Sequence, residues 1–278
     1  MKKSRPFEMD EYWKNLPLLE LSAKKFNEKL SDWYQLTEKT FQLALAVPFL
    51  KNYNKTQSIN ISIAFFKRCM TDFRSSFLLC DAGYPYQSAC VAASLYENSR
   101  VTCCLSYSQE LAQTFLSSSK PDIPWGPKDL SKMWVQSASG DKVGKPYPKT
   151  KEFEENWRCD YLRYKHLCKM KHPTLYHLND EVKHTAIPDL DQFAPIPIPD
   201  NREEALGLKQ YLLFCINQDL QIASSALVEA IFVKGVTGVT DESNEWESKY
   251  GELKGTIMNL LNQSKISDIS FKLSLDEL

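Results

Sequence analysis

Apolar residues recur every three or four positions along most of this chain, and this spacing constrains the fold more than any other feature. The first such stretch covers residues 17–53, and its apolar positions among lysines and glutamates are Leu19, Phe26, Leu30, Trp33 and Leu36. The spacing predicts a helix with one buried face, interrupted near its end by Pro48. The 278 residues include only nine glycines, whereas β-sandwiches and barrels need many turn residues. The sequence therefore predicts an all-α helical bundle.

Similar periodicity predicts further helices along the chain. Gly83 is placed to end one helix, and Pro85 suits the first turn of the next. The helix that follows Pro85 is rich in Ala, Cys, Val and Leu on most sides, so we expect it at the centre of the bundle. The expected helices cover residues 57–81, 85–105, 108–115, a short segment after Pro127, 150–171, 201–234 and 242–262.

Helix-boundary residues support the helices expected over 150–171 and 201–234. Acids follow Thr150 closely, where negative charge favours a helix start. Pro173 disfavours helical backbone at the preceding residue, His172, so this helix should end there. Asn201 and Glu204 resemble a capping box at the start of the next helix.

By composition the chain divides into a helical core and two peripheral parts. We expect an N-terminal helical extension over residues 1–56, a core domain over 57–235, and a C-terminal helix and tail over 236–278. Residues 117–149 are rich in Ser, Pro, Gly and Lys and predict a loop-rich excursion, which is a lid, a partner contact or a disordered segment. The prolines of 194–200 require extended backbone, either as a strap packed over the helices or as a ligand for another protein.

Composition also limits the compartment and the partners. The net charge is −1, so any attraction to nucleic acid must come from a local patch. No stretch approaches the roughly eighteen apolar residues of a membrane span, and the N-terminus turns acidic before any apolar segment that could serve as a signal peptide. Eight cysteines without a CxxC pair are typical of buried, reduced thiols. We expect a cytoplasmic protein with no membrane partner.

The four histidines lie together between residues 166 and 184, in a segment that is also basic. Arg158, Lys165, Lys169 and His172 are spaced so that a helix places them on one face. Like charges at this spacing repel each other unless an anion or carboxylates neutralise them. Such a face suits a phosphate ester, because lysines can hold the phosphate while His172 transfers a proton. Further candidate binding residues in this segment are Arg163, His166 and Lys171.

Two other interpretations of this segment stay open. A solvated basic helix face with a histidine near its end is the simplest alternative. Cys168 and His172 are four residues apart, a workable spacing for two zinc ligands, but no further residue completes a metal signature. The sequence also lacks a nucleotide-binding loop or hydrolase motif, so we expect no cofactor.

A second group of polar residues lies inside the most apolar of the expected helices. Glu97 and Arg100 are three residues apart there and can pair on the helix surface. Alternatively, Glu97 crosses the core to meet the basic residues of the 150–171 helix, because a buried carboxylate needs a charged partner.

These segments together resemble a group of prokaryotic helical domains of uncharacterised function. In that group a Gly-Tyr turn leads into a helix of the form A-x-x-L-x-R-S-L-x-E, and another helix ends in Y-x-x-L-x-x-x-x-H-P. Here Gly83-Tyr84 and Ala92–Glu97 resemble the first motif, with Ala where Arg is usual, and Tyr164–Pro173 resembles the second. The resemblance covers about residues 60–235.

The group is similar to the HEPN superfamily of small helical bundles, many of which dimerise and act as metal-independent ribonucleases in toxin and antiviral systems. The resemblance implies a prokaryotic defence or stress protein that takes RNA as its ligand and forms a homodimer. It also implies His172 as general acid/base, Lys165 and Lys169 as phosphate ligands, and Glu97 as the group that orients or neutralises the cluster.

The chain departs from the HEPN pattern at one position. HEPN nucleases use the motif R-x(4–6)-H, and no arginine precedes His172 at that spacing. Lys165 keeps the spacing, but lysine lacks the planar fork with which arginine grips phosphate. The alternative is therefore a non-catalytic module that dimerises or docks on a partner effector or sensor.

Overall fold

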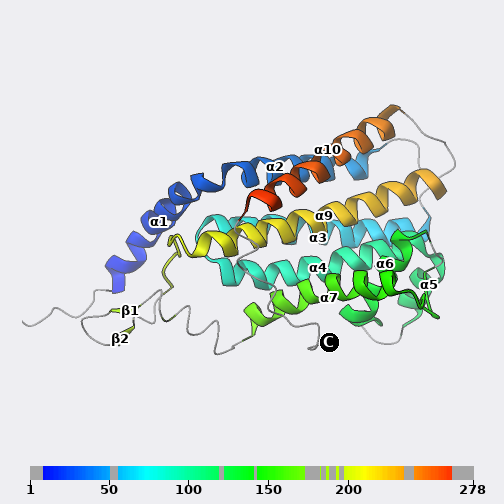
Figure 1. Cartoon of the computed structure of the whole chain (residues 1–278), viewed down its shortest axis with the longest axis horizontal. Coiled ribbons are helices and arrows are strands. Elements are labelled where there is room, and N and C mark those ends of the chain that lie inside the picture. The colour runs from blue at the N-terminus through cyan, green and yellow to red at the C-terminus, as the bar shows by residue number, and fades with distance from the viewer. Residues whose placement is uncertain are drawn as a thin grey trace, which may run out of the picture.

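The computed structural model describes residues 9–50, 56–118, 122–140, 143–172, 197–234 and 241–264, with short pieces at 182, 186–187 and 192–193 (Figure 1). These residues form a bundle of helices, which confirms the all-α expectation. The described strands are two residues each, β1 (Ala186–Ile187) and β2 (Gln192–Phe193), and they pair antiparallel.

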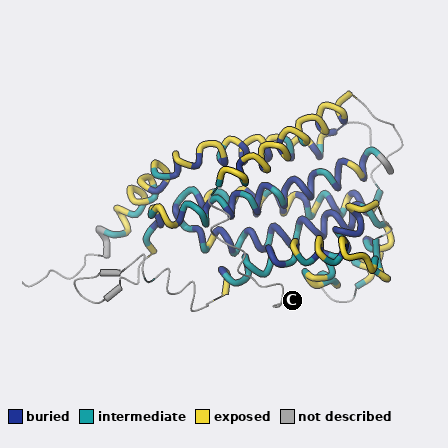
Figure 2. Tube along the Cα trace, viewed as in Figure 1, coloured by how far each residue is buried: buried dark blue, intermediate teal, exposed yellow. Residues whose placement is uncertain are grey.

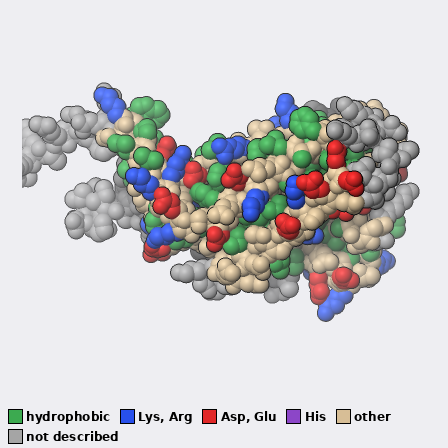
Figure 3. Space-filling model, turned by 90° about the horizontal axis from the view of Figure 1, so that it is seen from above, with side chains coloured by type: hydrophobic (Ala, Val, Ile, Leu, Met, Phe, Trp, Pro, Cys, Tyr) green, Lys and Arg blue, Asp and Glu red, His purple; other side chains and the backbone are tan. Residues whose placement is uncertain are grey.

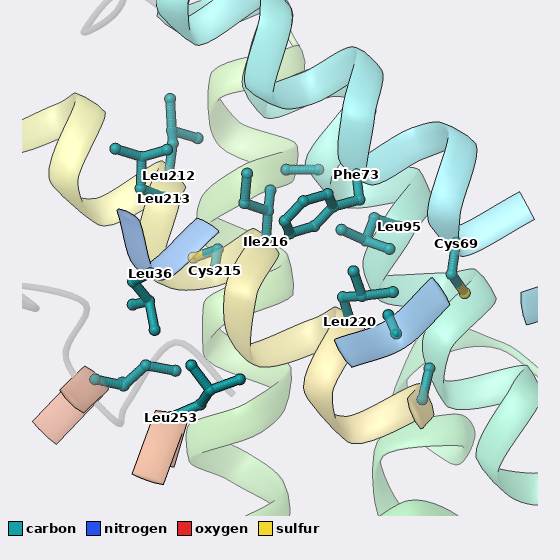
Figure 4. Close-up of a cluster of buried hydrophobic side chains, with 14 of the residues drawn as sticks. Leu36, Cys69, Phe73, Leu95, Leu212, Leu213, Cys215, Ile216, Leu220 and Leu253 are labelled. Atoms are coloured by element: carbon teal, nitrogen blue, oxygen red, sulfur yellow. The ribbon is translucent and has the colours of Figure 1, made fainter. Parts of the chain in front are cut away.

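Three long helices form the centre of the bundle. They are α3 (Gln57–Asp81), α4 (Pro85–Tyr107) and α9 (Ala205–Lys234), and each contacts the other two. Figure 2 shows α4 and α9 as largely buried. Phe73, Leu95, Ile216 and Leu220 meet where the three helices converge, and all are at most 1% exposed (Figure 4). The small side chains of α4 allow neighbours to approach on several sides, which confirms its expected central position.

The remaining helices cover this centre on two sides (Figure 1). On one side α2 (Ser31–Ala46) and α10 (Asp241–Gln263) pack on α9, and α1 (Met9–Phe26) continues the line of α2 beyond the bundle. On the other side α6 (Pro127–Ala138) and α7 (Lys151–Lys171) pack on α4. The Trp246 Nε1–H of α10 donates to the Leu43 carbonyl of α2 at 3.1 Å. The other peripheral elements are η1 (Asn27–Leu30), η2 (Val47–Phe49) and α5 (Gln109–Ser117).

One expected helix is wrong at its start and in its middle. In place of a single helix over 17–53, α1 begins at Met9, and the 3₁₀ turn η1 separates it from α2. Asn27 in η1 is fully buried, and its Nδ2 donates to the Asp81 carbonyl at 2.8 Å. The bend thus brings a polar side chain to the end of α3, an interaction that periodicity does not reveal. The interruption expected at Pro48 is present as η2.

The capping box expected at Asn201 is also wrong. α9 begins at Ala205, and the preceding residues form a turn in which the Ala205 N–H donates to the Arg202 carbonyl at 3.2 Å. By contrast, Thr150 caps α7 as expected, because its Oγ1 accepts from the Phe153 N–H at 3.2 Å. The helix expected after Pro127 is α6, which packs against α4 and α7.

The described end of the proline-rich segment, residues 197–200, packs against the helices as a strap. The Asp200 N–H donates to the Gly83 carbonyl at 2.7 Å. Gly83 has a φ of +91°, and a Cβ there would lie 2.7 Å from the Pro199 Cβ. Lys209, which is fully buried, donates to the Asp200 carbonyl at 2.6 Å and to Asn27 Oδ1 at 2.8 Å. Residues 194–196 lie outside the described part of the chain.

The outer face over α2 and α10 carries basic and acidic side chains that alternate without a large patch of one sign (Figure 3). Among the helices that the structure describes, none has an apolar stretch long enough to cross a bilayer.

Candidate functional site

The predicted basic residues of α7 divide into an exposed group and a buried one. Lys171 and His172 are exposed at the end of the helix, and Lys169 and Lys165 are half-buried within the two turns before them. His172 has extended backbone, and its N–H donates to the Cys168 carbonyl at 2.9 Å. We call Lys165, Lys169, Lys171 and His172 the basic end of α7.

Glu97 of α4 borders the basic end of α7. Its Oε1 accepts a hydrogen bond of 2.6 Å from the Tyr164 hydroxyl. Burial is the main factor that raises the pKa of Tyr164, and hydrogen bonds, including the one to Glu97, raise it further. The hydroxyl therefore stays protonated and acts as a donor. Tyr164, Cys168 and Lys171 are spaced by four and three residues, so they share the face of α7 nearest Glu97. Lys165 begins the adjacent face, on which Lys169 and His172 follow.

Three other predicted binding residues have different surroundings. Arg158 lies near Glu154, with Nε 3.4 Å from Oε2. The half-buried His166 packs edge-on against the Tyr211 ring at 4.9 Å between centroids. Arg163 is 4% exposed and so does not share the solvent-facing surface of the basic end.

Arg163 belongs instead to a buried ion cluster that joins α4, α7 and α9. Its Nη2 lies 3.1 Å from Asp160 Oδ1 and 2.6 Å from Asp219 Oδ1. Arg100 of α4, fully buried, bonds the same two carboxylates, at 2.5 Å to Asp160 and 3.1 Å to Asp219. Two arginines and two aspartates therefore balance each other in the core, and we call these four residues the buried ion cluster.

The surface pair expected between Glu97 and Arg100 is absent. Arg100 points into the core, where its guanidinium lies 4.4 Å from the centre of the Tyr96 ring and 4.5 Å from that of Trp134. Its carboxylate partners come from α7 and α9 because α4 is surrounded by helices on that side. Glu97, three residues earlier, turns to Tyr164 instead.

Asp160 is the most fully hydrogen-bonded member of the cluster. Besides the two arginines, it accepts bonds from the Tyr96 hydroxyl at 2.6 Å and the Ser131 hydroxyl at 2.9 Å. Burial alone would raise the pKa of Asp160, but Arg100 and Arg163 outweigh it and hold this pKa below its usual value. In Asp219, whose Oδ2 has no hydrogen-bond partner, burial dominates and raises the pKa.

A cavity of about 1210 Å³ opens beside this cluster, between α6, α7, α9 and the end of α10. Asp160 and Arg163 reach it from the cluster, and Gln218 lies next to them. None of Lys165, Lys169, Lys171, His172 or Glu97 is among its described lining residues, nor among those of a second cavity of about 570 Å³ beside α5 and α6. The other described lining residues are Trp134, Val135, Ala138, Ser139, Pro148, Thr150, Glu152, Phe153, Asn156, Cys159, Leu162, Phe214 and Leu261.

The described residues form no cluster of three or more His, Cys, Asp or Glu side chains that could hold a metal ion. Within that part of the chain, Cys168 and His172 thus gain no third ligand. His177 and His184 lie outside it. None of the eight cysteines is in a disulfide bond, as expected, and five of them are buried. Burial raises the pKa of Cys80, Cys103 and Cys215 to about 12, so these thiols are protonated at neutral pH.

Comparison of the chain with protein-family models, with curated proteins and with solved structures found no match. The class of this protein is therefore defined by its fold, an all-α bundle with a buried ion cluster and a basic helix end. The HEPN-like resemblance stays a prediction.

Proposed function

We propose that this chain is a HEPN-like helical protein that binds RNA through the basic end of α7. The observation that carries the proposal is the gathering of Lys165, Lys169 and Lys171 on the last two turns of α7 with His172 directly after them, in positions at least partly open to solvent. Phosphate contacts from lysine supply much of the affinity of proteins for nucleic acids. Because the net charge of the chain is −1, attraction to RNA has to come from such a local basic patch.

The proposal is for binding without cleavage. His172 is exposed at the end of a helix and lines neither of the two cavities described above. General acid–base catalysis gains from an enclosed site that positions the substrate and excludes water. Glu97 is bonded to Tyr164, which gives it a role in holding α4 against the basic end.

The test is fluorescence anisotropy with a labelled single-stranded RNA, which compares wild type with the double variant Lys165→Gln/Lys169→Gln. We expect the double variant to bind more weakly because two phosphate contacts are lost. The matched control is Lys39→Gln/Lys67→Gln, which removes two exposed helical lysines of α2 and α3 and should bind like wild type. Equal weakening by both double variants would show a general charge effect and contradict the proposal.

A second candidate function, docking on a protein partner, is favoured by the apolar surface of α1. Trp13, Leu18 and Leu21 are 75%, 63% and 48% exposed, and exposed apolar groups of this size often mark interaction sites. If α1 docks on a second copy, light scattering after size-exclusion chromatography will give a dimer mass that Trp13→Ser/Leu18→Ser reduces to the monomer. Leu116→Ser on α5, where Leu116 is 49% exposed, is the control and should leave the mass unchanged.

A further inference from the structure

A second group of cations gathers where α6 packs against the first half of α7 (Figure 1). The Nζ atoms of Lys128 and Lys132, both on α6, lie 5.2 and 4.5 Å from the centre of the Trp157 ring. The Arg158 guanidinium lies 5.5 Å from the same ring. Three cations are therefore gathered around one indole, to which each is attracted electrostatically. We call Lys128, Lys132 and Arg158 the α6–α7 basic patch.

The described carboxylates do not balance the charge of this patch. One of them, Glu154, lies with Oε2 3.4 Å from the Nε of the patch arginine. Another, Asp129, pairs with Lys145 at 3.9 Å. Lys128 and Lys132 form no ion pair with a carboxylate of the described residues, and like charges four residues apart on a helix repel each other. A phosphate group bound between the two lysines would relieve this repulsion.

The patch lies on the same side of α7 as the basic end. Arg158 precedes Lys165 by seven residues, and Lys165 precedes His172 by seven, so steps of about two turns place all three on one line along the helix. At a rise of about 1.5 Å per residue, this line is about 21 Å long. Successive phosphates of a stacked strand are roughly 3.4 Å apart along its axis, so about six of them would cover this distance.

An aromatic ring lies between these two groups of cations. Tyr161 follows Arg158 by three residues and precedes Lys165 by four, which places it on the same side of α7. Its ring is half-buried and stacks on that of Tyr164, with 6.0 Å between centroids. Cations interleaved with aromatic side chains are typical of surfaces that bind single-stranded nucleic acids, because bases stack on the rings.

We propose that single-stranded RNA lies along α7 from the basic end to the α6–α7 basic patch, with a base stacked on Tyr161. Lys128 and Lys132 then contact phosphates that a shorter RNA on the basic end does not reach. This proposal rests on the proposed function, since the basic end binds the other part of the strand. It adds the class of RNA, a single strand of at least about six nucleotides.

The first test measures the salt dependence of binding to a labelled single-stranded RNA of about twelve nucleotides, twice the estimated span. Fluorescence anisotropy gives the affinity at each salt concentration. Lys128→Gln/Lys132→Gln should make the slope of log affinity against log salt less negative by about 1.4, the value for two phosphate contacts. The matched control Lys39→Gln/Lys67→Gln should leave the slope unchanged. A wild-type slope in Lys128→Gln/Lys132→Gln would overturn the proposal.

Tyr161→Leu separates base stacking from phosphate contact. Loss of one stacked base should weaken binding roughly five- to 150-fold, while the slope should stay that of wild type because the cations are kept. The half-buried Tyr250 of α10 provides the control, and Tyr250→Leu should bind like wild type. Equal affinities of Tyr161→Leu and wild type would remove the stacked base from the proposal and overturn it in this form.

Lysine footprinting tests the same proposal in the wild-type protein, where loss of the fold by a variant cannot interfere. The full chain is acetylated with sulfo-NHS-acetate in the presence and absence of the RNA. Peptide mass spectrometry then gives the extent of modification at each lysine. A poly-glutamate peptide with the same net charge as the RNA is the control ligand.

The RNA should protect Lys128 and Lys132 together with Lys165 and Lys169. Protection of Lys165 and Lys169 alone would support the proposed function but overturn the extension to the α6–α7 basic patch. Protection of neither pair would contradict both. Equal protection by the poly-glutamate peptide would show a general anion-binding surface and overturn the assignment to single-stranded RNA.

Discussion

Arg163 of α7 and Asp219 of α9 are joined by a hydrogen bond of 2.6 Å between side chains that are 5% and 0% exposed. The pair sits in the buried ion cluster, where Arg100 and Asp160 complete the balance of charge. Four charged side chains in a core are costly to desolvate unless each has a partner. The cluster therefore fixes how α4, α7 and α9 fit together.

Removal of one arginine should destabilise the fold strongly. We expect Arg100→Met to lower the free energy of unfolding by about 3–5 kcal/mol, since it leaves Asp160 and Asp219 with too little positive charge in the core. Urea denaturation followed by circular dichroism measures this change. Arg158→Met is the control, because Arg158 and Glu154 are 42% and 44% exposed and such pairs contribute about 0–1 kcal/mol. A change below about 1 kcal/mol in Arg100→Met would contradict the role given to the cluster.

Gly83 and Gly251 should respond oppositely to the same substitution. Gly83→Ala puts a Cβ 2.7 Å from the Pro199 Cβ at a φ of +91°, so we expect it to cost about 1–3 kcal/mol of stability. Gly251 lies within α10, and a Cβ there would meet no neighbouring element within 4 Å, so Gly251→Ala should stabilise by up to about 1 kcal/mol. Thermal unfolding of both variants tests this. Equal shifts would mean that the strap does not rest on Gly83.

Stability should fall at alkaline pH because of the buried thiols. The pKa of Cys215 is raised to about 12 in the folded protein by burial, whereas unfolded cysteine titrates near pKa ~8.5. The unfolded state thus loses the thiol proton at lower pH than the folded state does. The stability that is present below pH ~8.5 is therefore lost as the pH rises toward 12, by up to about 1.4 kcal/mol per pH unit for each such thiol.

The slope of unfolding free energy against pH tests whether Cys215 contributes to this loss of stability. Cys215→Ala should make the plot of unfolding free energy against pH shallower between about pH 9 and 11. The exposed Cys159 provides the control, and Cys159→Ala should leave the slope unchanged. If the two variants gave the same slope, the burial of Cys215 would not be linked to stability in this way.

RNA incubated with the protein in EDTA should stay intact. His172 is exposed and lines neither described cavity, so we expect no enclosed site for metal-independent cleavage. Gel electrophoresis of a labelled RNA compares wild type with His172→Ala. Cleavage by wild type that the variant lacks would contradict this prediction and restore His172 as the general acid/base.

Helix positions were predictable because periodicity depends on local spacing. The helices expected over 57–81 and 150–171 correspond to α3 and α7. The interruption at η1 was not predictable, since it depends on a bond between Asn27 and the distant Asp81 carbonyl. In the same way, the capping pattern at Asn201 was outweighed by the strap, in which the Asp200 carbonyl accepts from Lys209.

The candidate sites were predictable only in part. Local spacing placed Lys165, Lys169 and His172 on one helix, but it could not show that Arg163 turns into the core. A signal did exist in the sequence: Arg100 and Asp219 are opposite charges inside the two most apolar helices, and buried charges need partners. The cavity depends on how α6, α7 and α9 meet, which no local pattern encodes.

The salt dependence of RNA binding tests the central claim most directly. For a single strand, the slope of log affinity against log salt concentration is about −0.7 for each neutralised phosphate. We predict that wild type has a clearly negative slope and that Lys165→Gln/Lys169→Gln makes it less negative by about 1.4, the value for two contacts. An unchanged slope in the double variant, or no binding by wild type at low salt, would contradict RNA recognition by the basic end of α7.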